Sequence, residues 1–368
     1  MNKLARYIIM AVVATLVAFT AWYFSNILAY VIISVVLSIL GKPLVRALGR
    51  VHIRQYKLPR TVAAAIALVG MWGIFIACFY FLLPAVANLV NELSNINIDQ
   101  ALSDMGHWLD TLQDWLIGHV PGVDASFSLR EAIADELTSI FDKTAVLTMF
   151  GSVTNTLIRF VIGAFVVSFI TFFFLKEEDL FTQGVLLLFP DRHEANAEAA
   201  LTDVNRLLSR YFIGLAIDMC CMMTLITLGL TLIAGLPFQV AIVLGALAGI
   251  LNVIPYIGAI ASSLTGIVIG TLMSIDGMVT TDVAPMIIKM ALVYVGAQVL
   301  DAAVSQPFIY SKSVRSHPLE IFLVILIAGS IGGIIGMLVA IPAYTVLRVF
   351  AKQFFNQFKL VQRLTKTI

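Results

Sequence analysis

Asp301 is a carboxylate set deep inside an apolar segment of the sequence, with other polar side chains spaced around it. On an α-helix Gln298 and Ser305 would share its face, because they lie three residues before and four residues after it. Gln306 follows directly. An ionisable group inside a membrane-spanning helix is a functional candidate, since burying it in lipid is costly. This set could hold a monovalent cation or a proton, or hydrogen-bond a hydroxylated solute. The alternative is a structural carboxylate that neighbouring polar groups satisfy.

A second carboxylate, that of Asp218, lies about two helical turns inside the apolar segment 211–234. It could bind an ion or a solute, or it could pair with Arg210 near the membrane surface. The remaining candidates lie at two turns within apolar segments: Asn252, Pro255, Gly258 and Ser330. The Asn252 amide could hydrogen-bond a solute or cap the end of a helix.

The composition places these residues in a membrane protein. Hydrophobic residues make up 60% of the 368 residues and charged residues 12%, whereas soluble domains are about half apolar and a quarter charged. We therefore expect an all-α, polytopic integral membrane protein in contact with the lipid bilayer.

A net charge of +1 gives no reason to expect a nucleic-acid partner. The sequence has no metal-ligand spacing of histidine and cysteine and no phosphate-binding Gly-Lys-Ser/Thr loop, so we expect no enzymatic activity, metal or cofactor.

Six apolar segments approach or exceed the length of about 20 residues that a membrane-spanning helix needs. They cover residues 7–24, 27–40, 61–83, 154–175, 211–234 and 286–310. Two longer segments, 238–273 and 318–350, are each interrupted near the middle by glycine or proline, which predicts helical hairpins. The expected architecture has about eight membrane helices, including the two hairpins.

The charged residues predict the orientation of these spans. Residues 42–60 hold six basic and no acidic side chains, which predicts a cytoplasmic loop and cytoplasmic termini for a protein of the inner membrane. The acid-rich segment 84–151 is expected outside, as a small helical cap that forms a substrate vestibule, an oligomer contact or only a connection. Residues 194–210 predict an amphipathic helix on the inner membrane surface. The resulting parts of the chain are 1–83, 84–151, 152–210, 211–351 and a basic tail, 352–368.

The second half of the chain has the pattern of an inverted repeat. With this orientation each of the spans 211–234 and 286–310 is followed by a hairpin, and the second set runs opposite to the first. Such repeats with interrupted helices are typical of secondary transporters, whose sites form where the interruptions meet. Alternatively, each hairpin crosses the membrane fully and its turn lies at the surface. The turns are expected at Ile254, Pro255, Tyr256 and Gly258, and at Gly329, Gly332 and Gly333.

Short strings at these turns resemble the autoinducer-2 exporter-like (AI-2E) family of bacterial membrane proteins. They are Gly235-Leu236-Pro237, Ile254-Pro255-Tyr256-Ile257-Gly258, His317-Pro318 and Ile341-Pro342. The resemblance implies an eight-helix plan with a cap, export of autoinducer-2 or exchange of sodium or lithium for protons, and a homo-oligomer, with a pentamer as the proposed arrangement. Leu215 and Ser305-Gln306-Pro307 depart from the family's usual pattern, which leaves the substrate open.

Three functional hypotheses follow from these patterns. The first is a secondary transporter, a permease or exporter of a small polar solute such as autoinducer-2, that works by alternating access between the two hairpins. The second is a monovalent cation/proton antiporter with Asp301 as the coupling carboxylate. The third is a membrane scaffold or sensor without transport activity, in which the acidic cap binds a partner.

Overall fold

The computed structural model describes residues 12, 15–16, 19–20, 23–50, 52–53, 56–95, 106–119, 128, 130–131, 153–177, 179–187, 189–275, 282–305, 318–355, 358 and 361–362. Most of the predicted first span, much of the predicted cap and Gln306 lie outside these residues. The chain forms two compact units. One comprises Met1–Phe75 with Thr154–Thr202, and the other comprises Ile76–Val153 with Asp203–Ile368.

The first unit is built from apolar helices. Helix α2 (Ser25–Gly49) is followed by two short antiparallel strands, β1 (His52–Ile53) and β2 (Tyr56–Lys57), and then by α3 (Arg60–Asn95). Helix α8 (Val153–Lys176) meets α9 (Leu180–Leu186) at a bend of 92°. Small side chains on α3 allow α2 and α8 to approach it closely. The resulting buried cluster contains Val45, Ala63, Ala64, Ala67 and Leu175.

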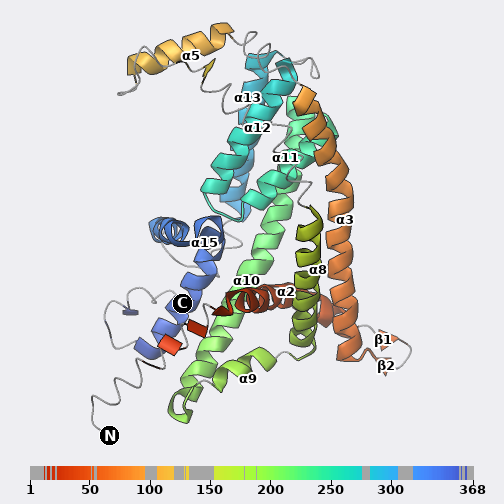
Figure 1. The fold of residues 1–368 in the computed structure, drawn as a ribbon, viewed down its shortest axis with the longest axis vertical. Coiled ribbons are helices and arrows are strands. Elements are labelled where there is room, and N and C mark those ends of the chain that lie inside the picture. Colours follow the sequence, from red (N-terminus) through yellow and green to blue (C-terminus); the bar gives the residue numbers. More distant parts are fainter. Residues whose placement is uncertain are drawn as a thin grey trace. The chain divides into compact units, whose positions relative to one another are not determined.

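Helix α10 (Asp191–Gly229) is longer than the sequence predicts. With the π-helical segment η1 (Leu230–Ala234) it forms one helix of 44 residues, which joins the predicted amphipathic helix to the predicted fifth span (Figure 1). No glycine or proline interrupts residues 191–213, and the buried stripe continues across the predicted boundary. Its members include Val204, Leu207, Tyr211 and Leu215. The helix is about 66 Å long and the hydrocarbon core is about 30 Å thick, so its polar first half extends beyond the hydrocarbon.

Two hairpins occupy the second unit after α10. The first consists of α11 (Phe238–Leu251) and α12 (Ile257–Ile275). The second is α15 (Pro318–Phe355), which is interrupted at Gly332 and Gly333 and changes direction there (Figure 1). Helix α13 (Val283–Leu300), extended by the π-helical segment η2 (Asp301–Ser305), precedes it. A helix with a π-helical end followed by a hairpin therefore occurs twice in succession.

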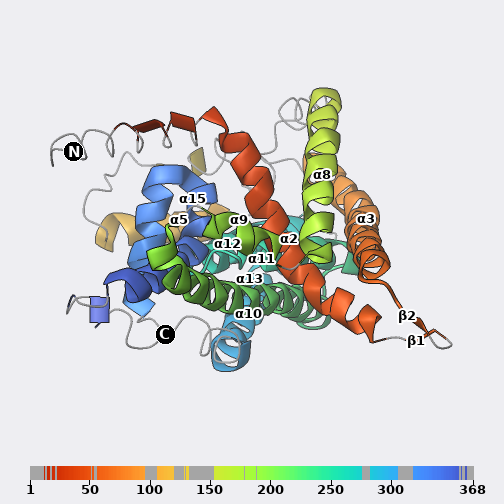
Figure 2. The same cartoon turned by 90° about the horizontal axis from the view of Figure 1, so that it is seen from below.

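Pairs of glycines bring the helices of the second unit together. Gly245 and Gly249 of α11 face α10, where an added Cβ atom would lie 2.7 Å and 2.6 Å from main-chain carbonyl oxygens. A matching pair on α12, Gly266 and Gly270, faces side chains of α13. This four-residue spacing of small residues lets membrane helices pack with their backbones close together. Helices α11, α12 and α13 accordingly lie side by side (Figure 1 and Figure 2).

The predicted cap contributes to this packing. Helix α3 continues past Pro84 to Asn95, so that Leu89 and Leu93 join the buried core formed by α10 to α13. Helix α5 (Gly106–His119) lies farther along the same predicted segment. Among the described residues six helices are long and apolar enough to cross a membrane, or seven if the bent α8 and α9 count as one span. The predicted all-α, polytopic membrane fold is confirmed.

Candidate functional site

The first turn, between α11 and α12, satisfies much of its own backbone. The N–H groups of Asn252 and Ile254 donate to carbonyls of α11, and Gly258 donates to the Ile254 carbonyl at 2.9 Å. Pro255 has no N–H to satisfy. A side chain at Gly258 would overlap the Leu251 carbonyl oxygen, so the turn requires glycine there. Because its donors are paired locally, this turn can be buried at a lower free-energy cost than an open loop.

Tyr256 is the strained residue of the first turn. Its φ of 66° lies in the left-handed region, which non-glycine residues rarely adopt and which costs about 1–3 kcal/mol. The Tyr256 ring packs edge-on against Phe322 of the second hairpin, with the ring centroids 6.0 Å apart. In the second hairpin Gly333 has a φ of 57°, which glycine tolerates. Each hairpin break thus contains one left-handed residue, and the left-handed residue of the first break contacts the other hairpin.

The second hairpin folds back at the predicted glycines. Residues that lie the same number of positions before and after Gly332 contact each other across the two legs. A Cβ atom at Gly336 would overlap the Ala328 carbonyl oxygen, and the Tyr344 hydroxyl donates a hydrogen bond to the Glu320 carboxylate. This antiparallel register confirms that residues 318–355 form a hairpin and not one straight helix.

The two hairpins meet on α10 in an apolar cluster that we call the hairpin cluster. Its buried members are Tyr211, Leu215, Ile254, Ile325, Ala340 and Ile341. Tyr211 and Leu215 belong to α10, Ile254 to the first turn, and the other members to α15. The turn of the first predicted repeat is therefore packed against the legs of the second hairpin, at residues seven to nine positions from Gly332. The predicted site, in which the two interruptions face each other, stays a prediction.

Asp218 of α10 is joined to the first turn by a buried hydrogen bond. Asn252 Nδ2 donates to Asp218 Oδ2 at 2.8 Å, and the residues are 9% and 1% exposed. Asp218 is therefore a buried acceptor within the second unit and not a carboxylate at the surface. This bond connects the mid-part of α10 to the exact point where the first hairpin turns.

The other predicted site residues are arranged as follows. Asp301 is 2% exposed at the start of η2, where the helix changes from α to π, and such segments are frequent at functional sites. The main-chain carbonyl of Gln298 accepts the Asp301 N–H. Ser305 is the last residue of η2, and Gln306 lies outside the described residues. The exposed Ser330 donates its hydroxyl to a carbonyl of its own helix at 2.8 Å.

A model of the AI-2E family transporter group matches residues 8–356. The chain belongs to the AI-2E family. The YueF protein of Bacillus subtilis (strain 168) is 27% identical over 350 residues, which cover 93% of this chain and 88% of YueF. The YrrI protein of the same strain is 26% identical over 302 residues, which cover 81% of this chain and 79% of YrrI. Both are named as proposed transport proteins. Together with the apolar helices, these AI-2E relatives support a role in membrane transport.

One polar cluster of this AI-2E family member was not predicted from the sequence. The Glu320 carboxylate accepts the Tyr344 hydroxyl, and the Arg348 guanidinium lies over the Tyr344 ring, 5.5 Å from its centroid. Arg348 is 6% exposed. These residues tie the two legs of the second hairpin together near their open ends. A usable signal was present, since Glu320 and Arg348 are ionisable residues within a long apolar segment, the same criterion that singled out Asp301.

Proposed function

We propose that this AI-2E family protein is a secondary transporter that exports a small polar solute, with autoinducer-2 as the first solute to test. The contact between the two hairpins carries the proposal. The first turn is bonded through Asn252 to Asp218 and is packed against α15 by the hairpin cluster. A turn within a membrane is stable only against protein or a wet cavity. Interrupted helices are where many secondary transporters bind their substrates, and here one interruption lies against the legs of the other hairpin.

In the proposed cycle the first turn separates from the second hairpin. We assign the present conformation to the closed form of this cycle, because the hairpin cluster is buried and the edge of one ring of the Tyr256–Phe322 pair meets the other ring. Separation exposes Asp218 and Asn252, whose carboxylate and amide supply hydrogen-bond acceptors and donors for a polar solute. The strained backbone of Tyr256 lowers the free-energy difference between the closed and open forms.

Cross-linking the first turn to the second hairpin tests this cycle. The double variant Tyr256→Cys/Phe322→Cys, in a background without the free cysteines Cys78, Cys220 and Cys221, is joined by a short thiol-reactive cross-linker that reducing agent cleaves. We expect the cross-linked protein to lose nearly all autoinducer-2 accumulation in everted membrane vesicles, because the turn can no longer leave α15. Reduction should restore accumulation.

Each single cysteine variant, treated with the same reagent, serves as the control and should transport normally. Undiminished accumulation by the cross-linked double variant would rule out alternating access at this contact. A wild-type protein that fails to accumulate autoinducer-2 would exclude that solute as the cargo.

The burial of Asp301 favours a second candidate function, the exchange of a monovalent cation for a proton. For this function we expect Asp301→Asn to abolish sodium-dependent proton release from everted vesicles, because an amide cannot bind and release a proton as a carboxylate does. The measurement is the fluorescence of a pH-sensitive dye after sodium is added. The matched control is Asp282→Asn, which changes an exposed carboxylate at the start of the same helix, α13. Proton release that persists in Asp301→Asn would exclude Asp301 as the coupling group.

A further inference from the structure

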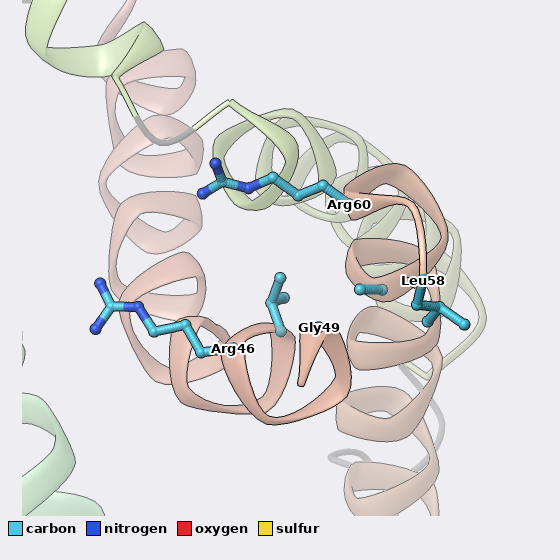
Figure 3. Close-up of a pocket in the computed structure, with 6 residues that line it drawn as sticks. Arg46, Gly49, Leu58 and Arg60 are labelled. Carbon is cyan, nitrogen blue, oxygen red and sulfur yellow. The ribbon is translucent and has the colours of Figure 1, made fainter. Parts of the chain in front are cut away.

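A pocket of about 290 Å³ lies in the first unit between the last turn of α2 and the first turn of α3. Figure 3 shows that Arg46 and Arg60 extend from the two helices toward the same side of this pocket. The residues that line it are Val45, Arg46, Gly49, Leu58, Arg60 and Ala63. The volume is close to the lower end of the range for small-ligand pockets, about 300 Å³.

The charge at this pocket is strongly positive. The first 91 residues of the chain contain no aspartate or glutamate, so this part of the sequence carries a net positive charge. Within the described part of the chain Arg46 forms no ion pair. The N-terminus of the long helix α3 adds partial positive charge at Arg60. Guanidinium groups bind phosphate through paired N–H donors, which makes a phosphate group the best match.

The interior of the pocket and its surroundings are apolar. Val45 and Ala63 are buried members of the α2, α3 and α8 cluster, and Leu58 packs against that cluster. Close to the pocket on the same two helices, Leu44 and Ile66 are 41% and 45% exposed on the outer faces of membrane-spanning helices. A ligand at this position therefore meets two cations at one end and apolar helix surface at the other. A phospholipid has this combination of a phosphate head group and acyl chains, and basic residues near the ends of spans attract anionic lipids.

The geometry points to a binding site for the phosphate group of an anionic phospholipid, with Arg46 and Arg60 on the phosphate and the acyl chains along α2 and α3. This site shares no residue with the proposed transport site, and the proposal does not depend on the transport function. The nature of the ligand follows from the two guanidinium groups and the apolar lining.

Native mass spectrometry of the delipidated full-length protein tests the site. Phosphatidylglycerol, phosphatidylcholine and inorganic phosphate are titrated separately. We expect phosphatidylglycerol to bind, phosphatidylcholine to bind more weakly, and Arg46→Gln/Arg60→Gln to lower the phosphatidylglycerol affinity by about tenfold or more. Gly49→Leu should lower it as well without a change of charge, because nothing lies within 4 Å of an added Cβ atom there and the side chain can occupy the pocket.

Arg50→Gln is the matched control, since Arg50 belongs to the same basic segment but does not line the pocket. It should bind phosphatidylglycerol like the wild type, and thermal unfolding without lipid should show that all variants are folded. An equal loss of affinity in Arg50→Gln would overturn the site in favour of general surface charge. Inorganic phosphate that binds as tightly as phosphatidylglycerol would overturn the lipid as the ligand. Unchanged binding in both pocket variants would overturn the proposal outright.

Discussion

Replacing Gly258 by alanine is expected to prevent the first hairpin from closing. The added methyl group would overlap the carbonyl oxygen of Leu251, and this contact is with backbone, which cannot rotate away as a side chain can. Overpacking typically costs about 1–3 kcal/mol, and a clash with backbone belongs at or above the upper end of that range. Since proteins are stable by only about 5–15 kcal/mol, we expect a large fall in the thermal midpoint and in the yield of monodisperse protein in detergent.

Gly336 of the second hairpin should behave in the same way, because a methyl group there would overlap the Ala328 carbonyl oxygen. Gly296 of α13 provides the control. Nothing lies within 4 Å of a Cβ atom at this position, and alanine is favoured over glycine inside a helix by about 1 kcal/mol. Gly296→Ala should therefore leave the thermal midpoint unchanged or raise it. A Gly258→Ala variant as stable as Gly296→Ala would show that the turn differs from the one described.

The membrane class and the positions of both turns could be predicted from the sequence because they depend on local properties. Apolar composition dictates burial in lipid, and glycine or proline within a long apolar run interrupts a helix wherever the run lies. The break at Gly332 and Gly333 is therefore found where the sequence predicts it. The left-handed conformation of Tyr256 could not be predicted in this way, because it is imposed on a bulky residue by the turn and its contact with Phe322.

The partners of the polar residues could not be predicted, because they depend on the packing of distant helices. Asp218 and Asn252 were separate candidates 34 residues apart in the chain, and the packing of α11 on α10 brings them into one hydrogen bond. Glu320 and Tyr344 meet because the second hairpin closes with a particular register.

The continuity of α10 was missed for a different reason. The change from a polar to an apolar sequence predicts a boundary of the membrane, and a helix can cross that boundary without ending.

Replacing Asp218 by asparagine is expected to lower the rate of solute transport by about tenfold. Asparagine has nearly the same size and keeps an oxygen that can accept the hydrogen bond from Asn252, but it replaces the carboxylate by a neutral amide. A hydrogen bond to a charged group contributes about 1.5–3 kcal/mol and a neutral one about 0.5–1.5 kcal/mol, and a difference of 1.4 kcal/mol corresponds to a factor of ten. The measurement is the initial rate of autoinducer-2 accumulation in everted vesicles at equal protein content.

Asp203→Asn is the matched control for this change. Asp203 lies on the same helix, is less buried than Asp218 and pairs with Arg206 at 2.6 Å, so its neutralisation should have little effect on transport. The exchange Asp218→Asn/Asn252→Asp keeps one carboxylate and one amide at the contact and should recover part of the rate, because the hydrogen bond can form in the reverse direction. Normal transport by Asp218→Asn would exclude a carboxylate at this position as a requirement of the transport cycle. A recovered rate in the exchanged pair would indicate that the connection between α10 and the first turn matters more than the position of the charge.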